Sequence, residues 1–255
     1  MDLEISWKNY LWLAVVWLAL GFFIFIVLQF KTAPYGRHAR TDWGPMISNR
    51  LGWIIMESTV LVVLWSWIGP AFSKMSLPAR LMALLFTVHY VNRSFIFPLR
   101  TRTRKKKMPL VVALMAVIFN LANGSLFGIY FVHFEDYTLD WFRDFKFWFG
   151  LLIFLTGIYV NWRADNYLIR LRKPGETGYQ IPRGWLFDFV SCPNLLGEMV
   201  EWLGFAILSW SLPGWVFFLW TCFNLIPRAV AHHRWYKTHF PEYPEKRKAF
   251  LPFVW

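Results

Sequence analysis

Seven apolar stretches, each 16 to 24 residues long, run through this chain of 255 residues. They cover residues 11–30, 51–68, 81–99, 109–132, 145–162, 195–210 and 213–230. A helix that crosses a membrane needs about 20 mainly apolar residues. With 57% hydrophobic and 21% aromatic residues, the chain has more apolar surface than a soluble domain of this length could bury. The sequence therefore predicts an all-α integral membrane protein, a bundle of seven transmembrane helices in a single domain over residues 1–255.

The loops between these stretches differ strongly in basic charge. Together 21 Lys and Arg lie in one set of alternating loops, 31–50, 100–108, 163–194 and 228–255. The opposite set, the N-terminus with loops 69–80, 133–146 and 211–212, carries 5. Because basic loops stay in the cytosol, we expect the N-terminus outside and the C-terminus in the cytosol. The chain start lacks a basic region and a small-residue cleavage site, so an uncleaved first helix is predicted.

Composition argues against several other classes of protein. The net charge of +12 comes from residues spread over the loops, which does not indicate a nucleic-acid-binding patch. Two cysteines, Cys192 and Cys222, predict no disulfide framework. No G-x-G-x-x-G follows a strand, as a soluble dinucleotide-binding domain would require. No metal is expected, because no standard metal-site spacing is found among Glu198, Glu201, His232 and His233.

Several polar groups fall inside the predicted spans, where an ionisable residue is interpreted as functional by default. At 1.5 Å of rise per residue, Glu57 and Glu201 lie about 9 Å from the cytosolic ends of their helices, and Tyr90 about 13 Å. Two other interpretations stay open: Glu57 could form a structural ion pair with Arg93, and Tyr90 could be an ordinary packed aromatic residue.

Further polar groups are expected at the same depth. Asn161 and Asp165 are predicted to cap the fifth helix on its cytosolic side, and Arg228, His232 and Tyr236 to follow the seventh. Groups from five helices thus converge on one zone of the bundle. This pattern predicts a cavity that opens toward the cytosol.

The chain resembles the steroid 5α-reductase family over nearly its whole length. The most specific segments are Leu-Arg-Lys-Pro-Gly-Glu at 171–176, Tyr-Gln-Ile-Pro-Arg-Gly at 179–184 and Phe-Val-Ser-Cys-Pro-Asn-Leu-Leu-Gly-Glu at 189–198. They continue with Glu-Trp-Leu-Gly at 201–204 and Arg-Ala-Val-Ala-His-His-Arg-Trp-Tyr at 228–236. The signature region extends over about 110–255, and the chain looks closest to type 2 members. The N-terminal half matches more loosely, through Tyr35 to His38, Glu57 and Val88 to Arg93.

The resemblance implies NADPH-dependent reduction of the C4–C5 double bond of 3-oxo-Δ4 steroids such as testosterone or progesterone. It implies a 3-oxo-5α-steroid 4-dehydrogenase, with the steroid entering from the lipid bilayer into a monomer that contacts membrane lipids and no nucleic acid. The membrane would be the endoplasmic reticulum in a eukaryote or the inner membrane in a bacterium.

Site residues follow from the resemblance position by position. Glu57 and Tyr90 match the pair that engages the steroid C3 carbonyl and would be the catalytic residues, and Trp202 and Phe223 would line the steroid slot. The residues expected to hold NADPH are Asn161, Asp165, Arg172, Tyr179, Asn194, Glu198, Arg228, His232 and Tyr236, with Tyr35, Arg37, Arg93 and Arg104 as additional contacts. The chain departs from the family pattern at Phe97, Thr101, Lys107 and Trp185.

The implied chemistry needs a polarised carbonyl, because only then is the β-carbon of an enone electrophilic. Tyr90 and a protonated Glu57 could both donate hydrogen bonds to the C3 oxygen and stabilise the developing enolate. Three alternatives stay open: a related membrane reductase acting on an enoyl thioester, polyprenol or sterol alkene; an isoprenylcysteine-type membrane methyltransferase; and a lipid-binding protein without enzymatic activity.

Overall fold

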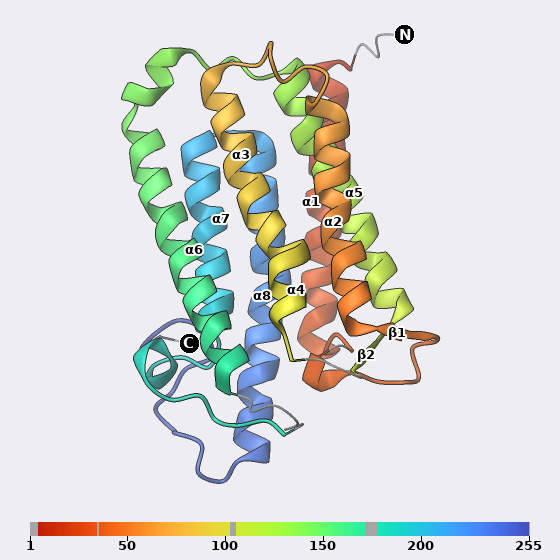
Figure 1. The fold of residues 1–255 in the computed structure, drawn as a ribbon, viewed down its shortest axis with the longest axis vertical. Coiled ribbons are helices and arrows are strands. Elements are labelled where there is room, and N and C mark those ends of the chain that lie inside the picture. Colours follow the sequence, from red (N-terminus) through yellow and green to blue (C-terminus); the bar gives the residue numbers. More distant parts are fainter. Residues whose placement is uncertain (1–4, 35, 103–105, 172–177, 255) are drawn as a thin grey trace.

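The computed structural model describes residues 5–34, 36–102, 106–171 and 178–254, and these form an elongated helical bundle (Figure 1). Its helices are α1 (Trp7–Phe30), α2 (Asn49–Ile68), α3 (Leu77–Val91), α4 (Phe97–Arg100), α5 (Leu110–His133), α6 (Phe145–Leu171), α7 (Pro193–Ser209) and α8 (Leu212–His239). The helices run up and down, so α2, α5 and α7 begin at the end where α1, α4, α6 and α8 finish (Figure 1). We call this end the basic end, because the basic loops of the sequence lie there.

Each predicted apolar stretch contains a helix, and five of the helices are long and apolar enough to cross a membrane. These are α1, α2, α5, α6 and α8. The α3 and α7 helices have 15 and 17 residues, which is short for a span. The protein is therefore an all-helical integral membrane protein.

The third predicted span is not a uniform α-helix. Between α3 and α4 lies one π-helical turn, Asn92–Ile96, in which the Phe97 N–H donates to the Asn92 carbonyl. Pro98 follows immediately; its nitrogen carries no hydrogen, and its ring would clash with the carbonyl four residues earlier. The wider turn accommodates the proline, and Arg93 lies within it, buried. Single π turns of this kind occur frequently at functional sites.

Two predicted helix ends are wrong. The α6 helix continues beyond residue 162 to Leu171, and α8 continues beyond residue 230 to His239. Asn161 and Asp165 therefore lie inside α6 instead of capping it. Likewise, Arg228, His232 and Tyr236 lie inside α8 instead of following it. Hydropathy marks where a helix leaves an apolar medium, whereas backbone hydrogen bonding continues through the polar residues that follow, many of which are acceptable helix formers.

A small sheet at the basic end was not predicted. Strands β1 (Met46–Ser48) and β2 (Lys107–Pro109) pair antiparallel, with Ile47 opposite Met108. The strands lead directly into α2 and α5, which pack together along the bundle. The sheet thus joins the basic-end loops that precede these two helices (Figure 1).

Close approach between α6 and α7 depends on glycine. A Cβ at Gly157 would overlap the backbone of Glu201, and a Cβ at Gly204 would overlap the backbone of Phe154. Small residues allow membrane helices to pack backbone against backbone in this way. The two helices consequently form the most closely packed pair in the bundle.

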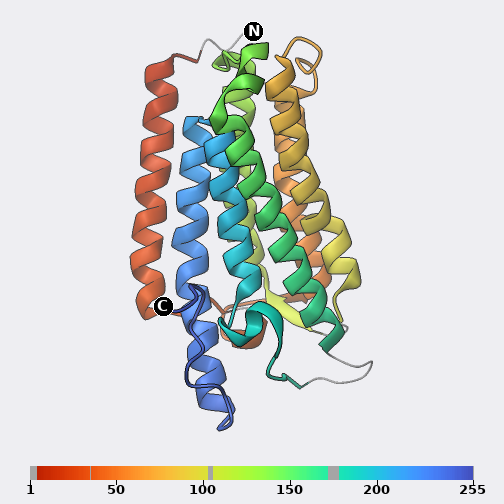
Figure 2. The same cartoon turned by 90° about the vertical axis from the view of Figure 1, so that its left-hand side faces the viewer.

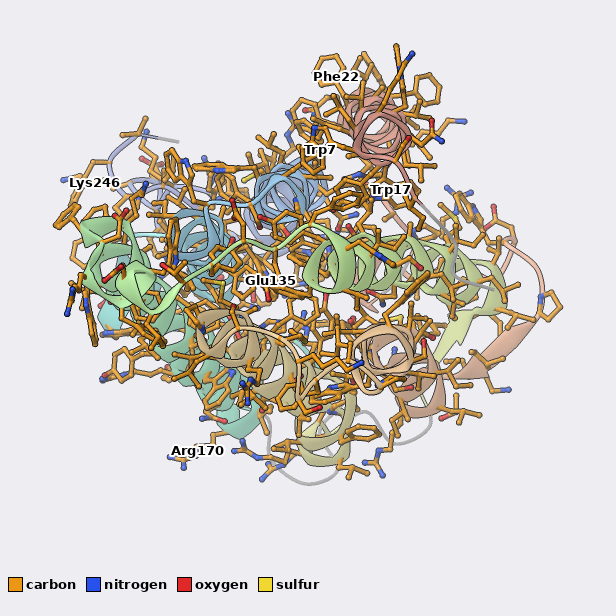
Figure 3. The ribbon with its side chains drawn as sticks, turned by 90° about the horizontal axis from the view of Figure 1, so that it is seen from above. Trp7, Trp17, Phe22, Glu135, Arg170 and Lys246 are labelled. Atoms are coloured by element: carbon orange, nitrogen blue, oxygen red, sulfur yellow. The ribbon has the colours of Figure 1, made fainter. Side chains whose placement is uncertain are left out.

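The α1 helix lies at the periphery of the bundle, beside α8 (Figures 2 and 3). Trp17 points toward the bundle, stacks on Trp220 at 4.8 Å between ring centroids and donates to Asn123 over 3.3 Å. Phe22 points away from it and is 52% exposed (Figure 3). An exposed apolar face of this kind fits contact with lipid tails.

Only two residues separate α7 from α8, so these helices form a tight hairpin. The α7 helix ends at Ser209, Trp210 adopts a left-handed backbone with φ of 45°, and α8 begins at Leu212. The Ser211 hydroxyl caps α8 by accepting from the Gly214 N–H over 3.2 Å.

Candidate active site

Tyr90 lies near the centre of the bundle in an aromatic environment. Its side chain is 4% exposed, and its ring lies 4.8 Å from Phe86, 5.0 Å from His89, 6.0 Å from Trp202 and 6.5 Å from Phe217. Within the described residues, its hydroxyl makes no hydrogen bond, and its oxygen is not completely enclosed. The hydroxyl is therefore available to donate to a ligand.

Glu57 approaches the same region from α2. The charged group that acts most strongly on its carboxyl is Arg93, and Asn120 of α5 also lies close to it; Tyr90 in turn is affected by the charge of Glu57. Asn120 is itself fixed, because its amide nitrogen donates to the Met56 carbonyl over 2.5 Å. The two residues predicted to be catalytic therefore belong to one electrostatic environment, to which α2 and α3 each contribute one of them.

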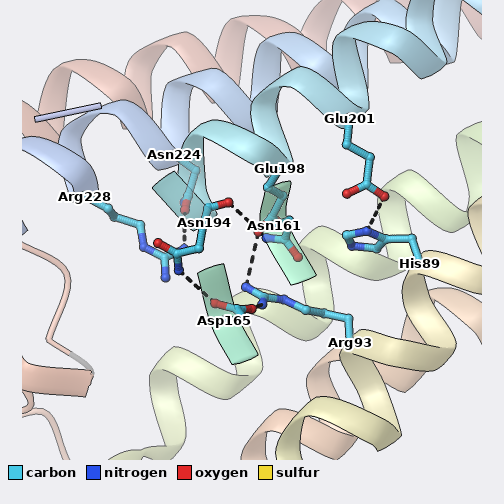
Figure 4. Close-up of polar contacts among 9 residues, drawn as sticks. All are labelled: His89, Arg93, Asn161, Asp165, Asn194, Glu198, Glu201, Asn224 and Arg228. Carbon is cyan, nitrogen blue, oxygen red and sulfur yellow. Dashed lines mark hydrogen bonds and ion pairs between the residues drawn. The ribbon is translucent and has the colours of Figure 1, made fainter. Parts of the chain in front are cut away.

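Directly beside Tyr90, His89 forms a buried hydrogen bond with Glu201 of α7. The distance from Nδ1 to Oε1 is 2.6 Å, and the two side chains are 3% and 0% exposed (Figure 4). When Glu201 is ionised its carboxylate can only accept, and the imidazole proton then lies on Nδ1.

Arg93 lies between two carboxylates. Its guanidinium is 3.4 Å from Asp165 Oδ2 of α6 and 3.4 Å from Glu198 Oε2 of α7 (Figure 4). It also lies over the rings of Trp53 and Phe97, at 4.9 and 5.1 Å from their centroids. Arg93 therefore pairs with α6 and α7 and, within the described chain, not with Glu57, which answers the alternative raised by the sequence.

Next to Arg93, a chain of amide groups joins α6 to the start of α7. The Asn194 amide donates to Asp165 Oδ1 over 3.0 Å, and the Asn161 amide donates to the Asn194 carbonyl over 3.0 Å (Figure 4). From α8, Arg228 donates to Asn224 over 3.1 Å. The structure thus brings Asn161, Asp165, Asn194 and Glu198 together with Arg93.

A second basic centre, formed by Arg37, lies closer to the basic end. The guanidinium lies 4.4 to 5.0 Å from the ring centroids of Tyr236, Trp235 and Tyr179, and Nη2 donates to the Tyr236 hydroxyl over 3.2 Å. Within the described residues, Nη1 is buried without a hydrogen-bond partner. Lys106 also lies over the Tyr179 ring, with its Nζ 4.8 Å from the centroid. In the part of the chain that the structure describes, Arg37 is thus an enclosed cationic group with a donor available.

His38 and His232 connect this centre to α8. Their rings stack at 5.2 Å, with 3.2 Å between His38 Nε2 and His232 Nδ1. Partial burial, reinforced by the nearby Arg37 and His239, lowers the pKa of His38 below its ordinary value. Beside the pair, a groove of about 490 Å³ is lined by Phe30, Lys31, Thr32, His38, Arg40 and Trp43.

The remaining predicted residues are distributed as follows. Trp202 lies against both His89 and Tyr90, whereas Phe223 packs on the α1 side of α8, against Phe22 and Phe25. Three predicted cofactor residues lie outside the described residues: Tyr35, Arg104 and Arg172.

Sequence reasoning missed the roles of Lys106 and Trp235. Lys106 was treated as one of several loop charges; in the structure it immediately precedes β2, and its carbonyl accepts from the Asn49 N–H over 3.0 Å. Trp235 lies in the family-like segment 228–236, but nothing in the sequence indicated that it covers Arg37. Trp185, one of the positions where the chain departs from the family pattern, has a φ of 52°, a left-handed conformation that glycine adopts without steric cost.

Comparison with known proteins identifies the family. The sequence model of the 3-oxo-5-alpha-steroid 4-dehydrogenase family matches residues 106–255. Steroid 5-alpha-reductase DET2 of Arabidopsis thaliana is 42% identical over 90% of both chains. The 3-oxo-5-alpha-steroid 4-dehydrogenases 1 and 2 of Rattus norvegicus are 40% and 39% identical, over 92% and 88% of this chain and 91% and 89% of their own lengths. These similar identities do not single out the type 2 members. The chain belongs to the 3-oxo-5-alpha-steroid 4-dehydrogenase family of membrane oxidoreductases.

Proposed function

We propose that this protein reduces the C4–C5 double bond of 3-oxo-Δ4 steroids, with NADPH as reductant. The observation that carries the proposal is Tyr90, whose ring is packed among aromatic rings and whose hydroxyl has no hydrogen-bond partner in the described chain and lies in the electrostatic environment of Glu57. Such a hydroxyl suits an apolar ligand that presents a carbonyl oxygen to it. The family match and the identities of about 40% to steroid reductases favour this reaction over the methyltransferase and lipid-binding alternatives.

The donor groups fit a phosphorylated dinucleotide. Arg37 offers a buried N–H without a partner, and guanidinium groups bind phosphate through paired hydrogen bonds. Lys106 and the His38–His232 pair lie beside it. The amides of Asn161 and Asn194 and the carboxylates of Asp165 and Glu198 would hold the polar groups nearer the bundle centre. We assign Tyr179, Arg228 and Tyr236 to the same site, together with Tyr35, Arg104 and Arg172.

The chain's own residues would act on the C3 carbonyl. When bound, NADPH supplies a hydride, which a conjugated enone accepts at its β-carbon, C5. Tyr90 donates a hydrogen bond to the C3 oxygen, and protonated Glu57 donates a second one. Both donors strengthen their bonds as negative charge develops on that oxygen, which lowers the barrier. A proton then adds at C4 and restores the ketone.

The aromatic rings around Tyr90 would exclude water from the reacting atoms, and Trp202 would form one wall of the steroid site. We assign Phe223 to the lipid-facing part of that site, where it contacts α1. We further propose that the steroid enters from the bilayer, that all seven stretches span the membrane with the basic end in the cytosol, and that the protein acts as a monomer. The membrane would be the endoplasmic reticulum or a bacterial inner membrane.

The test compares Glu57→Gln and Tyr90→Phe with the unmodified protein, purified in detergent. Both variants are expected to lower the turnover of progesterone or testosterone by about 10²-fold or more, the loss typical of removing one oxyanion donor. NADPH affinity, measured by nucleotide fluorescence, should be unchanged. Unaltered steroid reduction in both variants would remove the proposed roles. Methyl transfer from S-adenosylmethionine, or reduction only of an enoyl thioester, would replace the proposed function.

A further inference from the structure

The buried pair His89–Glu201 is absent from the residues assigned above to steroid or NADPH. Both side chains are almost fully buried, and their bond is only 2.6 Å long (Figure 4). Burying a polar pair inside an apolar bundle is costly, and similar volumes of hydrocarbon often serve stability equally well. The pair therefore calls for an explanation beyond holding the bundle together.

This bond fixes α3 relative to α7. Within the described chain, it is the only hydrogen bond between these two helices. A directional bond sets position along the helix axis, whereas apolar contacts tolerate sliding. The relative position of α3 and α7 consequently depends on His89 and Glu201.

The residues that follow the pair in sequence are two of the assigned site residues. His89 precedes Tyr90, and Glu201 precedes Trp202. The imidazole contacts both of their rings edge to face, at 5.0 Å from the Tyr90 centroid and 4.7 Å from the Trp202 centroid. The imidazole, the phenol and the indole thus form one cluster of three rings in mutual contact, because the Tyr90 and Trp202 centroids are themselves 6.0 Å apart.

Glu201 is itself held from behind by α6. Its backbone lies where a Cβ of Gly157 would be, so α6 blocks movement of α7 in that direction. The contacts form a continuous series from α6 through Glu201 and His89 to the Tyr90 ring. The first step is a backbone contact, the second a short polar bond and the third a ring contact, and the side chains of Glu201, His89 and Tyr90 are all buried.

We propose that His89 and Glu201 are positioning residues, which hold the Tyr90 hydroxyl at the place where it meets the steroid 3-oxo group. This inference rests on the proposed function, because it assigns a role through Tyr90. It differs from a purely structural role in one measurable respect. Loss of the pair should weaken recognition of the 3-oxo group specifically, and not recognition of the steroid skeleton.

The experiment measures binding of two saturated steroids, 5α-pregnane-3,20-dione and 5α-pregnan-20-one, to the full-length protein with NADP⁺. These ligands differ only at C3 and are not reduced. The hydrogen bond from Tyr90 should make the 3-oxo steroid bind roughly two- to tenfold tighter to the unmodified protein, in addition to any contribution from Glu57. We call this Tyr90-dependent share the 3-oxo preference; Tyr90→Phe should remove it and leave the share that Glu57 contributes.

Glu201→Met removes the bond, and Glu201→Gln keeps an oxygen that can accept from His89 and serves as the matched control. We expect the Met variant to lose the 3-oxo preference while its affinity for the 3-deoxy steroid changes less than twofold. The Gln variant should keep the preference. Adding Glu201→Met to Tyr90→Phe should change nothing further.

Because Glu201→Met leaves His89 buried without a partner, it could fail to fold. The double variant His89→Met/Glu201→Met replaces both groups with hydrocarbon and avoids that cost. It should retain the unmodified melting temperature and lose the 3-oxo preference. Retention of the preference by either variant, or equal weakening of both steroids, overturns the inference.

A different result identifies failure of the proposed function. If the unmodified protein does not distinguish the two steroids, or if Tyr90→Phe distinguishes them as strongly as the unmodified protein does, Tyr90 does not contact the carbonyl. The positioning role then falls with it. If Tyr90→Phe abolishes the preference and the pair variants preserve it, only the positioning role is wrong.

Discussion

Gly157→Ala should destabilise the protein, because α6 and α7 are in backbone contact at this residue. The added Cβ would overlap the amide nitrogen and Cα of Glu201 and would lie 2.7 Å from its Cβ. Backbone atoms cannot rotate out of the way as the end of a side chain can, so the helices would have to separate. Separation would also displace the Glu201 bond to His89.

The magnitude follows from two opposing effects. Alanine favours a helix over glycine by about 1 kcal/mol, whereas overpacking costs about 1–3 kcal/mol. Since the obstruction is backbone, the upper part of that range applies, and the net loss is roughly 1–2 kcal/mol. At roughly 2–4 °C per kcal/mol for a chain of this size, the melting temperature should fall by about 2–8 °C.

Thermal unfolding in detergent measures this shift, with a thiol-reactive dye that reports exposure of the free, buried Cys192. Gly178→Ala makes the same chemical change where no atom lies within 4 Å of the new Cβ, so it controls for the change in backbone entropy. The reasoning is refuted if Gly157→Ala melts at or above the temperature of the unmodified protein while Gly178→Ala does not differ from it.

Two further predictions concern the basic end. Arg37→Met should weaken NADPH binding roughly 10- to 100-fold, because a charge-assisted hydrogen bond contributes about 1.5–3 kcal/mol; titration of nucleotide fluorescence measures it. Arg37→Lys keeps the charge but loses the planar contact with three rings, so its affinity should be intermediate. Acid should lower the stability of the protein through His38. Burial lowers the pKa of His38 in the folded protein, so the unfolded chain binds more protons below the ordinary histidine pKa of about 6.5. The contribution of His38 to the free energy of unfolding is therefore fully present above that pH and is lost as the pH falls below it, and His38→Gln should reduce the acid sensitivity in a series of melting temperatures.

Each of these two predictions has a clear contrary result. NADPH affinity that is unchanged in Arg37→Met would show that the enclosed guanidinium does not contact the nucleotide. A melting temperature that falls equally with acid in His38→Gln and the unmodified protein would place the titrating group elsewhere.

The apolar stretches were sufficient to predict the helices, because hydrophobic length is a local property of the chain. Glu57 and Tyr90 were also noticeable in the sequence, because each is a polar residue inside a predicted span. That observation needs no knowledge of their neighbours in space. Helix ends were less predictable: Asn161 and His232 lie inside helices that hydropathy alone ends too early. Backbone hydrogen bonding continues past the end of the apolar stretch, so a helix can extend beyond the membrane.

Partnerships between distant residues could not be predicted in the same way. Arg93 pairs with Asp165 and Glu198, although Glu57 was the partner that the sequence suggested. The π turn before Pro98 rotates this part of the helix, and a regular helical repeat takes no account of that rotation. Likewise, Arg37 contacts the rings of residues that lie about 140 to 200 positions further along the chain. No local sequence pattern indicates such a contact.

The sequence by itself determined that this chain enters a membrane, where along the chain its helices lie and which family it resembles, because apolar stretches and the order of motifs are properties of the linear chain. Only the tertiary structure decided which side of each helix faces which neighbour. That choice depends on glycines that let α6 meet α7 and on one buried bond between His89 and Glu201. Contacts of this kind join residues 44 and 112 positions apart, and their energies depend on distances of a few ångströms that spacing in a sequence does not contain.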